Sequence, residues 1–335
     1  MDLPAPRPRN RHFAPGGEFA LIEALFAEDR FSADGKGLGD DACLFEAGGE
    51  TWAVTTDASV EGIHYRLDWA PPEAALAKCL LSNLSDINAM GGRPALAFLA
   101  LGALAAWGEG EVARLGAALR GLETRYGFRV AGGDTVRKAA ESFFSFTLLG
   151  RVAGRPLLRS NARPGHGVYV SGTLGGSAAG LHLLERGARP GDGGGHEALL
   201  DAHLKPEPPL GLGPYLASLP GPVAAIDLSD GLSSELWHLS RQSGCRLTLD
   251  MGKLPYRDGL DAAAGGQRGL REAWALHGGE EYQLLFTGDF GEAELAGMRE
   301  HARITRIGSV AGGAGVGAVD GAGGESELEP GGWTH

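Results

Sequence analysis

The sequence has little cysteine, a deficit of basic residues and no long apolar run. Only 3 cysteines occur in 335 residues, and none belongs to a Cys-x-x-Cys pair, so neither a disulfide framework nor a zinc knuckle is indicated. The longest apolar run, residues 95–107, is shorter than the roughly 20 residues that cross a bilayer. The polar, proline-rich start is unlike a signal peptide. We therefore expect a protein of the reducing cytoplasm with no membrane partner.

Acidic residues outnumber basic ones, with 42 Asp and Glu against 30 Lys and Arg and a formal net charge of -12. A general nucleic-acid binder presents a basic face, so this balance disfavours a nucleic-acid partner. It also means that a polyanionic ligand needs something other than protein charge to neutralise it.

The common nucleotide-binding motifs are missing as well. There is no Gly-x-x-x-x-Gly-Lys-Ser/Thr sequence, and Asp289-Phe290-Gly291 lacks the other protein-kinase motifs, so we interpret it as chance. The glycine-rich segment 171–177 resembles a strand-to-helix turn that can meet an anion through backbone N–H groups. Close packing of backbone is the simpler reason for its glycines.

Short apolar runs alternate with helical patterns, which predicts a mixed α/β fold. A helix is predicted from Pro71 to Gly91, because proline suits a first turn and apolar residues follow at helical spacing. Further helices are predicted at 111–126, after Gly175-Gly176 and after Gly231. The predicted strands are 52–56, 95–101, 128–131, 143–152, 168–171, 224–227, 246–249 and 282–287.

The length indicates two domains, at roughly 100–200 residues for each. Polar sequence with Gly and Pro at 154–156 and 163–165 separates two strand-rich blocks. We therefore expect an N-terminal domain of residues 1–153 and a C-terminal domain of residues 154–335.

Five short motifs place aspartate among glycine, serine and threonine. Three of them follow directly on a predicted strand, where side chains converge at the mouth of a sheet. Asp86 instead lies near the end of the helix predicted from Pro71. The motifs are Gly39-Asp40-Asp41-Ala42, Thr55-Thr56-Asp57, Leu84-Ser85-Asp86, Gly132-Gly133-Asp134-Thr135 and Asp227-Leu228-Ser229-Asp230-Gly231.

Short carboxylates on turns suit a hard divalent cation. Mg²⁺ takes oxygen ligands and keeps places for water and substrate phosphates. Any one motif is more simply a turn or a helix cap, and a calcium or structural ion also fits the five together. Asp227 and Asp230 favour a functional site, because a turn or helix cap does not need two aspartates three residues apart.

If magnesium ions bridge an acidic cleft and a bound triphosphate, the cations rather than lysines neutralise the phosphates. Such ions reconcile a polyanionic ligand with an acidic protein. Arg159 is the best basic candidate for a phosphate contact, and a plain surface arginine is the alternative.

Taken together, the motifs resemble thiamine-monophosphate kinase, within the wider superfamily of aminoimidazole ribonucleotide synthetase-like ATP enzymes. The resemblance covers nearly the whole chain. Besides the acidic motifs, it is carried by Gly17-Glu18-Phe19, by His64 seven residues after Asp57, and by 83–91, 171–173 and Gly278-Gly279-Glu280-Glu281-Tyr282.

The resemblance implies a fold of two α/β domains whose N-terminal domains pair into a barrel in a homodimer, with ATP and several Mg²⁺ ions in the cleft. The implied metal ligands are Asp41, Thr55, Thr56, Asp57, Asp86, Asp134, Asp227 and Asp230. Asp57, Asp134 and Asp230 are the expected catalytic residues. The implied ATP contacts are Asp41, Thr56, Gly133, Asp134, Arg159 and Ser229, and the implied thiamine monophosphate contacts are His64, Glu280 and Trp333.

Each of the three substrate residues also suits a plain structural role when the family is set aside. His64 suits a surface histidine, Glu280 suits a turn after two glycines, and Trp333 suits an anchor for the tail. The family often ends with an aromatic, Asp, His, Phe run, whereas this chain ends Gly332-Trp333-Thr334-His335.

The implied reaction passes the γ-phosphoryl group of ATP to thiamine monophosphate, giving thiamine diphosphate and ADP. The attacking phosphate monoester has a second pKa of about 6, so no strong general base is needed at neutral pH. One alternative is another ATP enzyme of the superfamily, such as a selenophosphate synthetase, although no catalytic cysteine stands near the start. The other is a non-catalytic metal-binding dimer, against which the full set of aspartates argues.

Overall fold

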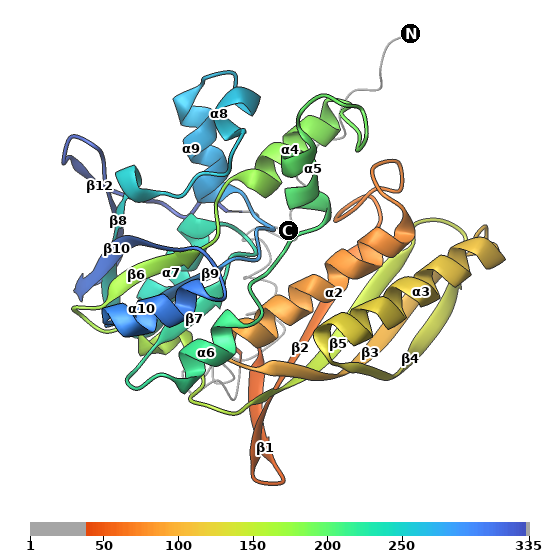
Figure 1. Cartoon of the computed structure of the whole chain (residues 1–335), viewed down its shortest axis with the longest axis horizontal. Helices are drawn as coiled ribbons and strands as arrows, with labels where there is room; N and C mark the ends of the chain where they lie inside the picture. The colour runs from red at the N-terminus through yellow and green to blue at the C-terminus, as the bar shows by residue number, and fades with distance from the viewer. Residues whose placement is uncertain (1–37, 333–335) are drawn as a thin grey trace, which may run out of the picture.

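The computed structural model describes residues 38–332, which form two β-sheets with helices packed against them (Figure 1). Gly17-Glu18-Phe19 and Trp333 lie outside the described residues. Within 38–332, no helix is both long enough and apolar enough to cross a membrane. Cys43, Cys79 and Cys245 form no disulfide with one another.

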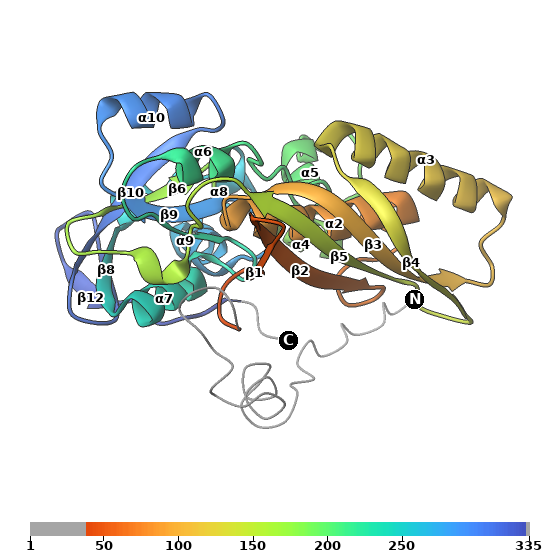
Figure 2. The ribbon, with the colours of Figure 1, turned by 90° about the horizontal axis from the view of Figure 1, so that it is seen from below.

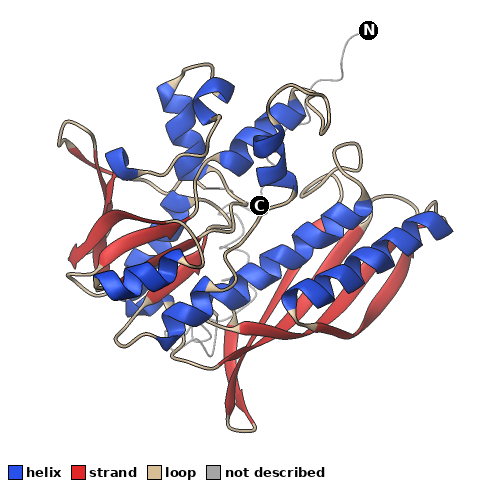
Figure 3. Ribbon diagram, in the orientation of Figure 1, coloured by secondary structure: helices blue, strands red, loops and turns tan. Residues whose placement is uncertain are grey.

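The first sheet has five strands in the order β1-β2-β5-β3-β4. They are β1 (Cys43–Ala47), β2 (Glu50–Val60), β3 (Arg93–Leu104), β4 (Arg129–Lys138) and β5 (Phe143–Val152). Neighbours are antiparallel except β3 and β4, which are parallel and joined by helix α3 (Glu109–Tyr126). Helix α2 (Pro72–Ala89) and α3 lie side by side across one face of this sheet (Figure 3).

The covered face of the first sheet is its core. Helix α2 begins at a proline and buries Leu76, Leu80, Leu84 and Ile87, each at most 2% exposed, against the sheet. Strand β5 sends alternate residues, Phe144, Phe146 and Leu148, into the same core. Each fully buried aliphatic or aromatic side chain contributes roughly 1.5–3 kcal/mol, so this face holds α2 firmly in place.

The opposite face of the sheet, called the open face below, has no described helix over it within 38–332 (Figure 2). Strand register assigns to the open face Val54, Thr56, Leu96, Phe98, Asp134, Val136, Thr147 and Leu149. Phe98 is 39% exposed and Val136 is 43% exposed, which is unusual for large apolar residues in strands.

The second sheet has seven strands in the order β12-β11-β8-β10-β6-β9-β7. They are β6 (Gly167–Ser171), β7 (Ala224–Asp227), β8 (Cys245–Asp250), β9 (Leu284–Gly288), β10 (Ile304–Gly312), β11 (Val316–Val319) and β12 (Glu325–Glu327). Its helices are α4 (Gly176–Glu185), α5 (Glu197–Leu204), α6 (Leu212–Ser218), α7 (Leu232–Ser243), α8 (Leu260–Ala263), α9 (Arg268–His277) and α10 (Glu292–Arg299).

Both faces of the second sheet are buried even at its edge strand β7. Ala224 and Ile226 of β7 point into a core shared with α7, whereas Ala225 points into one shared with α6 and α10. This alternation explains why β7 is a continuous apolar run ending in Asp227.

The two sheets meet where the C-terminal end of α2 packs on α6. The backbone N of Gly213 donates to Asn88 Oδ1 at 2.9 Å, and a side chain at Gly213 would clash with the Asn88 carbonyl. Gly91 at φ +81° ends α2, and a Cβ there would lie 2.6 Å from Ala217. This close approach fixes α2 against the second sheet.

Every strand and helix predicted from the sequence has a counterpart, but several bounds were wrong. Strand β2 continues to Val60 and β4 to Lys138, so Asp57 and Asp134 lie inside strands instead of past their ends. Strand β9 begins at Leu284, because Glu280 and Tyr282 adopt positive φ values of 59° and 51°. Strands β1, β10, β11 and β12 and helices α5, α6, α8, α9 and α10 were not predicted.

Candidate active site

Three aspartates from distant parts of the chain meet where the two sheets join. Asp41 precedes β1, Asp86 lies on α2, and Asp227 ends β7. One carboxylate oxygen of each lies within 4.8 Å of those of the other two. These aspartates are from three of the five acidic motifs, and the fold brings them together as the sequence analysis expects for a metal site.

The electrostatics of this cluster favour a cation. Burial, then the charges of Asp57, Asp227 and Asp41, raise the pKa of Asp86 well above its usual range. Burial and the charge of Asp41 do the same for the pKa of Asp227. Asp41 Oδ2 and Asp227 Oδ2 are buried without a hydrogen-bond partner among the described residues. Buried carboxylate oxygens are costly unless paired, and a hard divalent cation satisfies several at once.

Strand β2 places two more side chains with oxygen atoms, Thr55 and Asp57, on the covered face beside this cluster. Thr55 Oγ1 donates to Asp86 Oδ2 at 2.5 Å, and the backbone N of Asp57 donates to Asn83 Oδ1 at 3.2 Å. Residues 55 and 57 point to the same side of the strand because side chains alternate. Thr55, Asp57 and Asp86 therefore belong to one site.

Thr56 points the other way, onto the open face, where its Oγ1 lies 2.8 Å from Thr147 Oγ1. Asp134 is on the same face of β4, in register with Ala100 of β3, which pairs with Ser145 of β5. Asp134 is therefore three strands from β2, about 14 Å at roughly 4.8 Å per strand. Its Oδ1 accepts from the backbone N of Thr135 at 2.9 Å. Within one chain, the structure does not bring Asp134 and Gly133 to the cluster.

The loop after β7 carries Ser229 and Asp230, and a glutamate that we did not predict holds it. Glu235, in the first turn of α7, accepts from the backbone N of Asp230 at 3.0 Å and from Ser229 Oγ at 3.4 Å. Burial and the charge of Asp230 raise the pKa of Glu235 to about 8. Asp230 therefore follows Asp227 of the cluster by three residues, on a loop fixed by its own helix.

Arg159 is a half-buried residue of the site, with 15% of its side chain exposed, and not a surface arginine. Its Nη2 donates to Asp41 Oδ1 at 2.7 Å, its Nη1 to the Gly39 carbonyl at 3.2 Å, and its backbone N to Asp40 Oδ1 at 2.8 Å. Burial raises the pKa of Asp40 to about 6, although the Arg159 contacts oppose this shift. Arg159 thereby fixes the direction of the Asp41 carboxylate.

A separate pocket lies at the other end of α2 and includes His64. Arg66, Trp69, Lys78 and His203 also line it. His64 Nδ1 accepts from the backbone N of Val60 at 3.1 Å, which fixes the ring at the end of β2.

Glu280 connects this pocket with the loop after β7 that carries Ser229 and Asp230. Its carboxylate pairs with Lys78 Nζ at 2.8 Å and with His203 Nδ1 at 3.4 Å, and its backbone N donates to the Ser229 carbonyl at 2.7 Å. Burial opposes ionisation, but Lys78 and His203 outweigh it and lower the pKa of Glu280. Glu280 is thus a charged carboxylate at a strained backbone position, held in place on two sides.

The glycine-rich turn before α4 is occupied by the chain's own anion. Glu281 Oε1 accepts from the backbone N of Ser177 at 3.0 Å, and burial raises the pKa of this carboxyl to about 7. A Cβ at Gly175 would lie 2.7 Å from Leu260. Close packing, the simpler reason inferred from the sequence, therefore accounts for the turn.

Sequence reasoning missed Lys78, Asn83, His203 and Glu235. None of the four carried a local signal. Lys78 lies about 200° around the helix from Leu76 and from Leu80, on the side that the periodicity predicts to be exposed. The other three owe their roles to contacts across the fold.

The chain is similar to known proteins both in sequence and in structure. A family model described as AIR synthase related protein, N-terminal domain, matches residues 39–152. The thiamine-monophosphate kinase of Escherichia coli K12 is 39% identical over 275 residues, which cover 81% of this chain and 82% of that protein. The enzyme of the same name from Bacillus subtilis is 33% identical over 302 residues, covering 88% and 91%. The structure of AaThiL complexed with AMPPCP and TMP matches with a TM-score of 0.82 at 30% identity, covering 95% of this chain and 97% of that chain. This chain therefore belongs to the thiamine-monophosphate kinase family.

Proposed function

We propose that this protein transfers the γ-phosphoryl group of ATP to the phosphate of thiamine monophosphate, giving thiamine diphosphate and ADP. The observation that carries the proposal is the cluster of Asp41, Asp86 and Asp227, two of whose buried oxygens have no hydrogen-bond partner among residues 38–332. A relative of 30% identity is known in complex with AMPPCP and TMP, which supports the choice of substrates.

Mg²⁺ is the ion that this donor set suits, since all the side chains offer oxygen. Asp41, Thr55, Asp57, Asp86, Asp227 and Asp230 would hold the ions. When bound, Mg²⁺ cancels charge between the two phosphates and holds them in line. Arg159 and Glu235 orient the ligands Asp41 and Asp230, and Ser229 lies on the same loop for an ATP contact.

The residues of the chain supply positioning and not a base. The acceptor phosphate, with a second pKa of about 6, is mostly ionised at neutral pH. His64 lines the pocket at the start of α2, and Glu280 pairs with Lys78, which also lines it. We assign this pocket to thiamine monophosphate, with Trp333 as a further contact. Lys78 joins them, because it holds Glu280 ionised.

We further propose a homodimer in which the first sheets pair through their open faces into a barrel. The exposed apolar residues Phe98 and Val136 support this pairing, because such a face is costly in water. In the dimer, Thr56, Gly133 and Asp134 face a partner subunit and can meet ATP or Mg²⁺ there. Residues 1–153 and 154–335 are then the dimerisation domain and the domain that completes the site, in a cytoplasm that keeps the three thiols reduced.

The test is to incubate the full chain with ATP, Mg²⁺ and thiamine monophosphate, and to measure ADP and the fluorescent oxidised form of thiamine diphosphate. We expect thiamine diphosphate to form and ADP release to depend on thiamine monophosphate. ADP release without that dependence indicates another enzyme of the superfamily, and no ADP release indicates a binding protein.

A further inference from the structure

Of the three clustered aspartates, Asp41 is the one that needs support from elsewhere in the fold. Asp86 lies on helix α2 and Asp227 ends strand β7, whereas Asp41 lies on an irregular bend before β1. Oxygens of the three lie within 4.8 Å of one another, so their charges oppose this arrangement until a cation binds. The Asp41 side chain is nonetheless only 2% exposed. Contacts from outside the bend must therefore keep its carboxylate in the cluster.

The bend is held by residues that follow much later in the chain. Within residues 38–332, the hydrogen bonds of Gly39, Asp40 and Asp41 run to Arg159 and to Gln242 of helix α7. Gln242 Nε2 donates to the Gly39 carbonyl, to which Arg159 Nη1 also donates at 3.2 Å. Gly39 lies at φ +123°, a backbone conformation that favours glycine. The glycine of this acidic motif therefore turns the chain at the point that Gln242 holds.

Ser243, the last residue of α7, holds Arg159 itself. Its Oγ donates to the Arg159 carbonyl at 2.7 Å and accepts from the backbone N of Ala162 at 3.0 Å. One hydroxyl thus spans the 3₁₀ turn on which Arg159 lies. Because Arg159 Nη2 donates to Asp41 Oδ1 at 2.7 Å, the end of α7 acts on this carboxylate through the arginine as well as through the bend.

Helix α7 also supports the opposite side of the site. Glu235, which holds the loop that carries Asp230, precedes Gln242 by seven residues (242 − 235). In an α-helix this spacing puts the two side chains about 20° apart around the axis and about 10 Å apart along it. One flank of α7 therefore holds both the Asp230 loop and the Asp41 bend.

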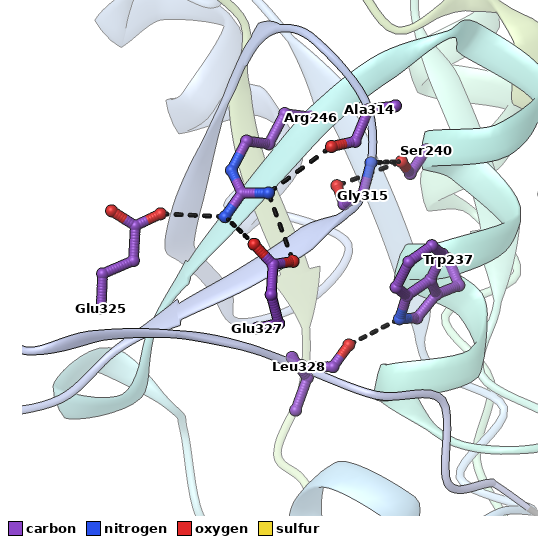
Figure 4. Close-up of polar contacts among 8 residues, drawn as sticks. All are labelled: Trp237, Ser240, Arg246, Ala314, Gly315, Glu325, Glu327 and Leu328. Atoms are coloured by element: carbon purple, nitrogen blue, oxygen red, sulfur yellow. Dashed lines mark hydrogen bonds and ion pairs between the residues drawn. The ribbon is translucent and has the colours of Figure 1, made fainter.

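The other flank of α7 is fastened to the C-terminal part of the chain (Figure 4). Ser240 Oγ lies 3.1 Å from both the N and the O of Gly315, and Trp237 Nε1 donates to the Leu328 carbonyl at 2.6 Å. By the same helical geometry, Trp237 and Ser240 lie about 140–200° around the axis from Glu235. These bonds fix α7 from behind, so the residues on its first flank can hold their partners in place.

We propose that Gln242 and Ser243 are positioning residues of the metal site, which keep Asp41 in place to bind Mg²⁺. Each acts through another residue, Gln242 through the Gly39 carbonyl and Ser243 through Arg159. This inference rests on the proposed function, because Mg²⁺ is the ion of that same site. Loss of either residue should weaken the binding of the ion and leave the pocket at the start of α2 unchanged.

The test compares Gln242→Met with Gln267→Met, a control that removes the amide of an exposed glutamine at the start of α9. Titration calorimetry of the full chain with Mn²⁺ alone measures Kd for the ion. We expect Gln242→Met to raise this Kd about fivefold, the size of one lost hydrogen bond, and Gln267→Met to leave it unchanged. KM for ATP at limiting Mg²⁺ should rise with it, whereas KM for thiamine monophosphate should match that of the control.

A double variant shows whether the effect passes through Asp41. Asp41→Ala should weaken Mn²⁺ binding more than Gln242→Met does, and adding Gln242→Met to it should cause little further loss, because the carboxylate that Gln242 positions is already gone. Ser243→Ala should raise Kd in the same way as Gln242→Met. Because it removes a single hydroxyl, Ser243→Ala decides the question if Gln242→Met does not fold.

Equal Kd values for Gln242→Met and Gln267→Met overturn the proposal, and so do losses that add fully in the double variant. A wild-type protein that binds no Mn²⁺ overturns the metal site and this inference together. If Gln242→Met weakens Mn²⁺ binding as expected but the wild type makes no thiamine diphosphate, the proposed phosphoryl transfer fails and the positioning role stands.

Discussion

The two faces of the five-stranded sheet carry different halves of the predicted site. On the covered face, Thr55 and Asp57 meet Asp86 of α2, and their surroundings are buried and crowded with negative charge. On the open face, Thr56 and Asp134 stand among exposed apolar residues. Neighbours in sequence thus have different surroundings, because the side-chain period of a strand is two.

This contrast shows that a motif alone does not make a site. The covered-face set is assembled within one chain, by α2, β2, β7 and the segment before β1. The open-face set has no counterpart among residues 38–332 of the same chain, and we assign its completion to a second subunit. The predictions below test these two assignments, beginning with the largest expected effect.

Asp57→Asn and Asp230→Asn should each lower turnover by about 100-fold or more, because loss of one charge weakens the hold on Mg²⁺ where phosphate charge must be cancelled. Steady-state rates over a Mg²⁺ titration check this. The control is Asp261→Asn, which removes an exposed carboxylate paired with Arg271. Near wild-type rates for both variants at limiting Mg²⁺ contradict the metal assignment.

Phe98→Glu combined with Val136→Glu should convert the dimer to a monomer and reduce activity at least tenfold, because charge on the open face opposes its burial. Light scattering after size exclusion measures the mass. Val112→Glu is the matched control, since Val112 is 60% exposed on helix α3, away from the open face. A wild-type protein that is monomeric in solution contradicts the proposed pairing of open faces into a barrel.

Lys78→Met should raise KM for thiamine monophosphate by about tenfold or more, because the half-buried Glu280 carboxylate loses its nearest cation. Without Lys78 the pKa of Glu280 rises, so the acid limb of the kcat/KM profile moves to higher pH. Lys205→Met, which removes an exposed lysine paired with Asp201, should change neither quantity. An unshifted acid limb in Lys78→Met shows that Glu280 is not needed in its ionised form.

Metal-free protein should lose thermal stability as pH rises from about 4 to about 8. Burial raises the pKa of Asp40 to about 6 and that of Glu235 to about 8, so the folded state binds protons that the unfolded state has released. Stability therefore falls with rising pH up to about 8, by a few degrees in melting temperature.

Excess Mg²⁺ should flatten this dependence, because the cation replaces the protons in neutralising the carboxylates. Differential scanning fluorimetry with chelator and with Mg²⁺ gives both curves. Curves that coincide across this pH range contradict a cation site among the acidic residues.

Much of the fold was predictable from local pattern. Helical spacing predicted the buried face of α2, which carries Leu76, Leu80, Leu84 and Ile87, and the apolar run 224–227 predicted β7. Strands β10 and β11 were missed because the glycine-rich sequence 311–317, where β10 ends and β11 begins, is typical of a loop, whereas both strands pair with β8. Strand β12 pairs in turn with β11.

The site was predictable in its residue types but not in its geometry. The five motifs indicated carboxylates for a cation, and three of them do converge. Asp134 was expected past a strand end, but β4 runs on to Lys138, so the strand period decides which face the aspartate takes. The Glu280–Lys78 pair joins residues 202 positions apart (280 − 78), and no local pattern specifies such a contact.

Anomalous diffraction from crystals grown with Mn²⁺ and a non-hydrolysable ATP analogue tests the central claim most directly. We predict a Mn²⁺ peak bonded to oxygens of Asp86 and Asp227, with the analogue's phosphates on the far side of the ion. A map in which the analogue is bound, but no metal peak lies within bonding distance of either carboxylate, contradicts it.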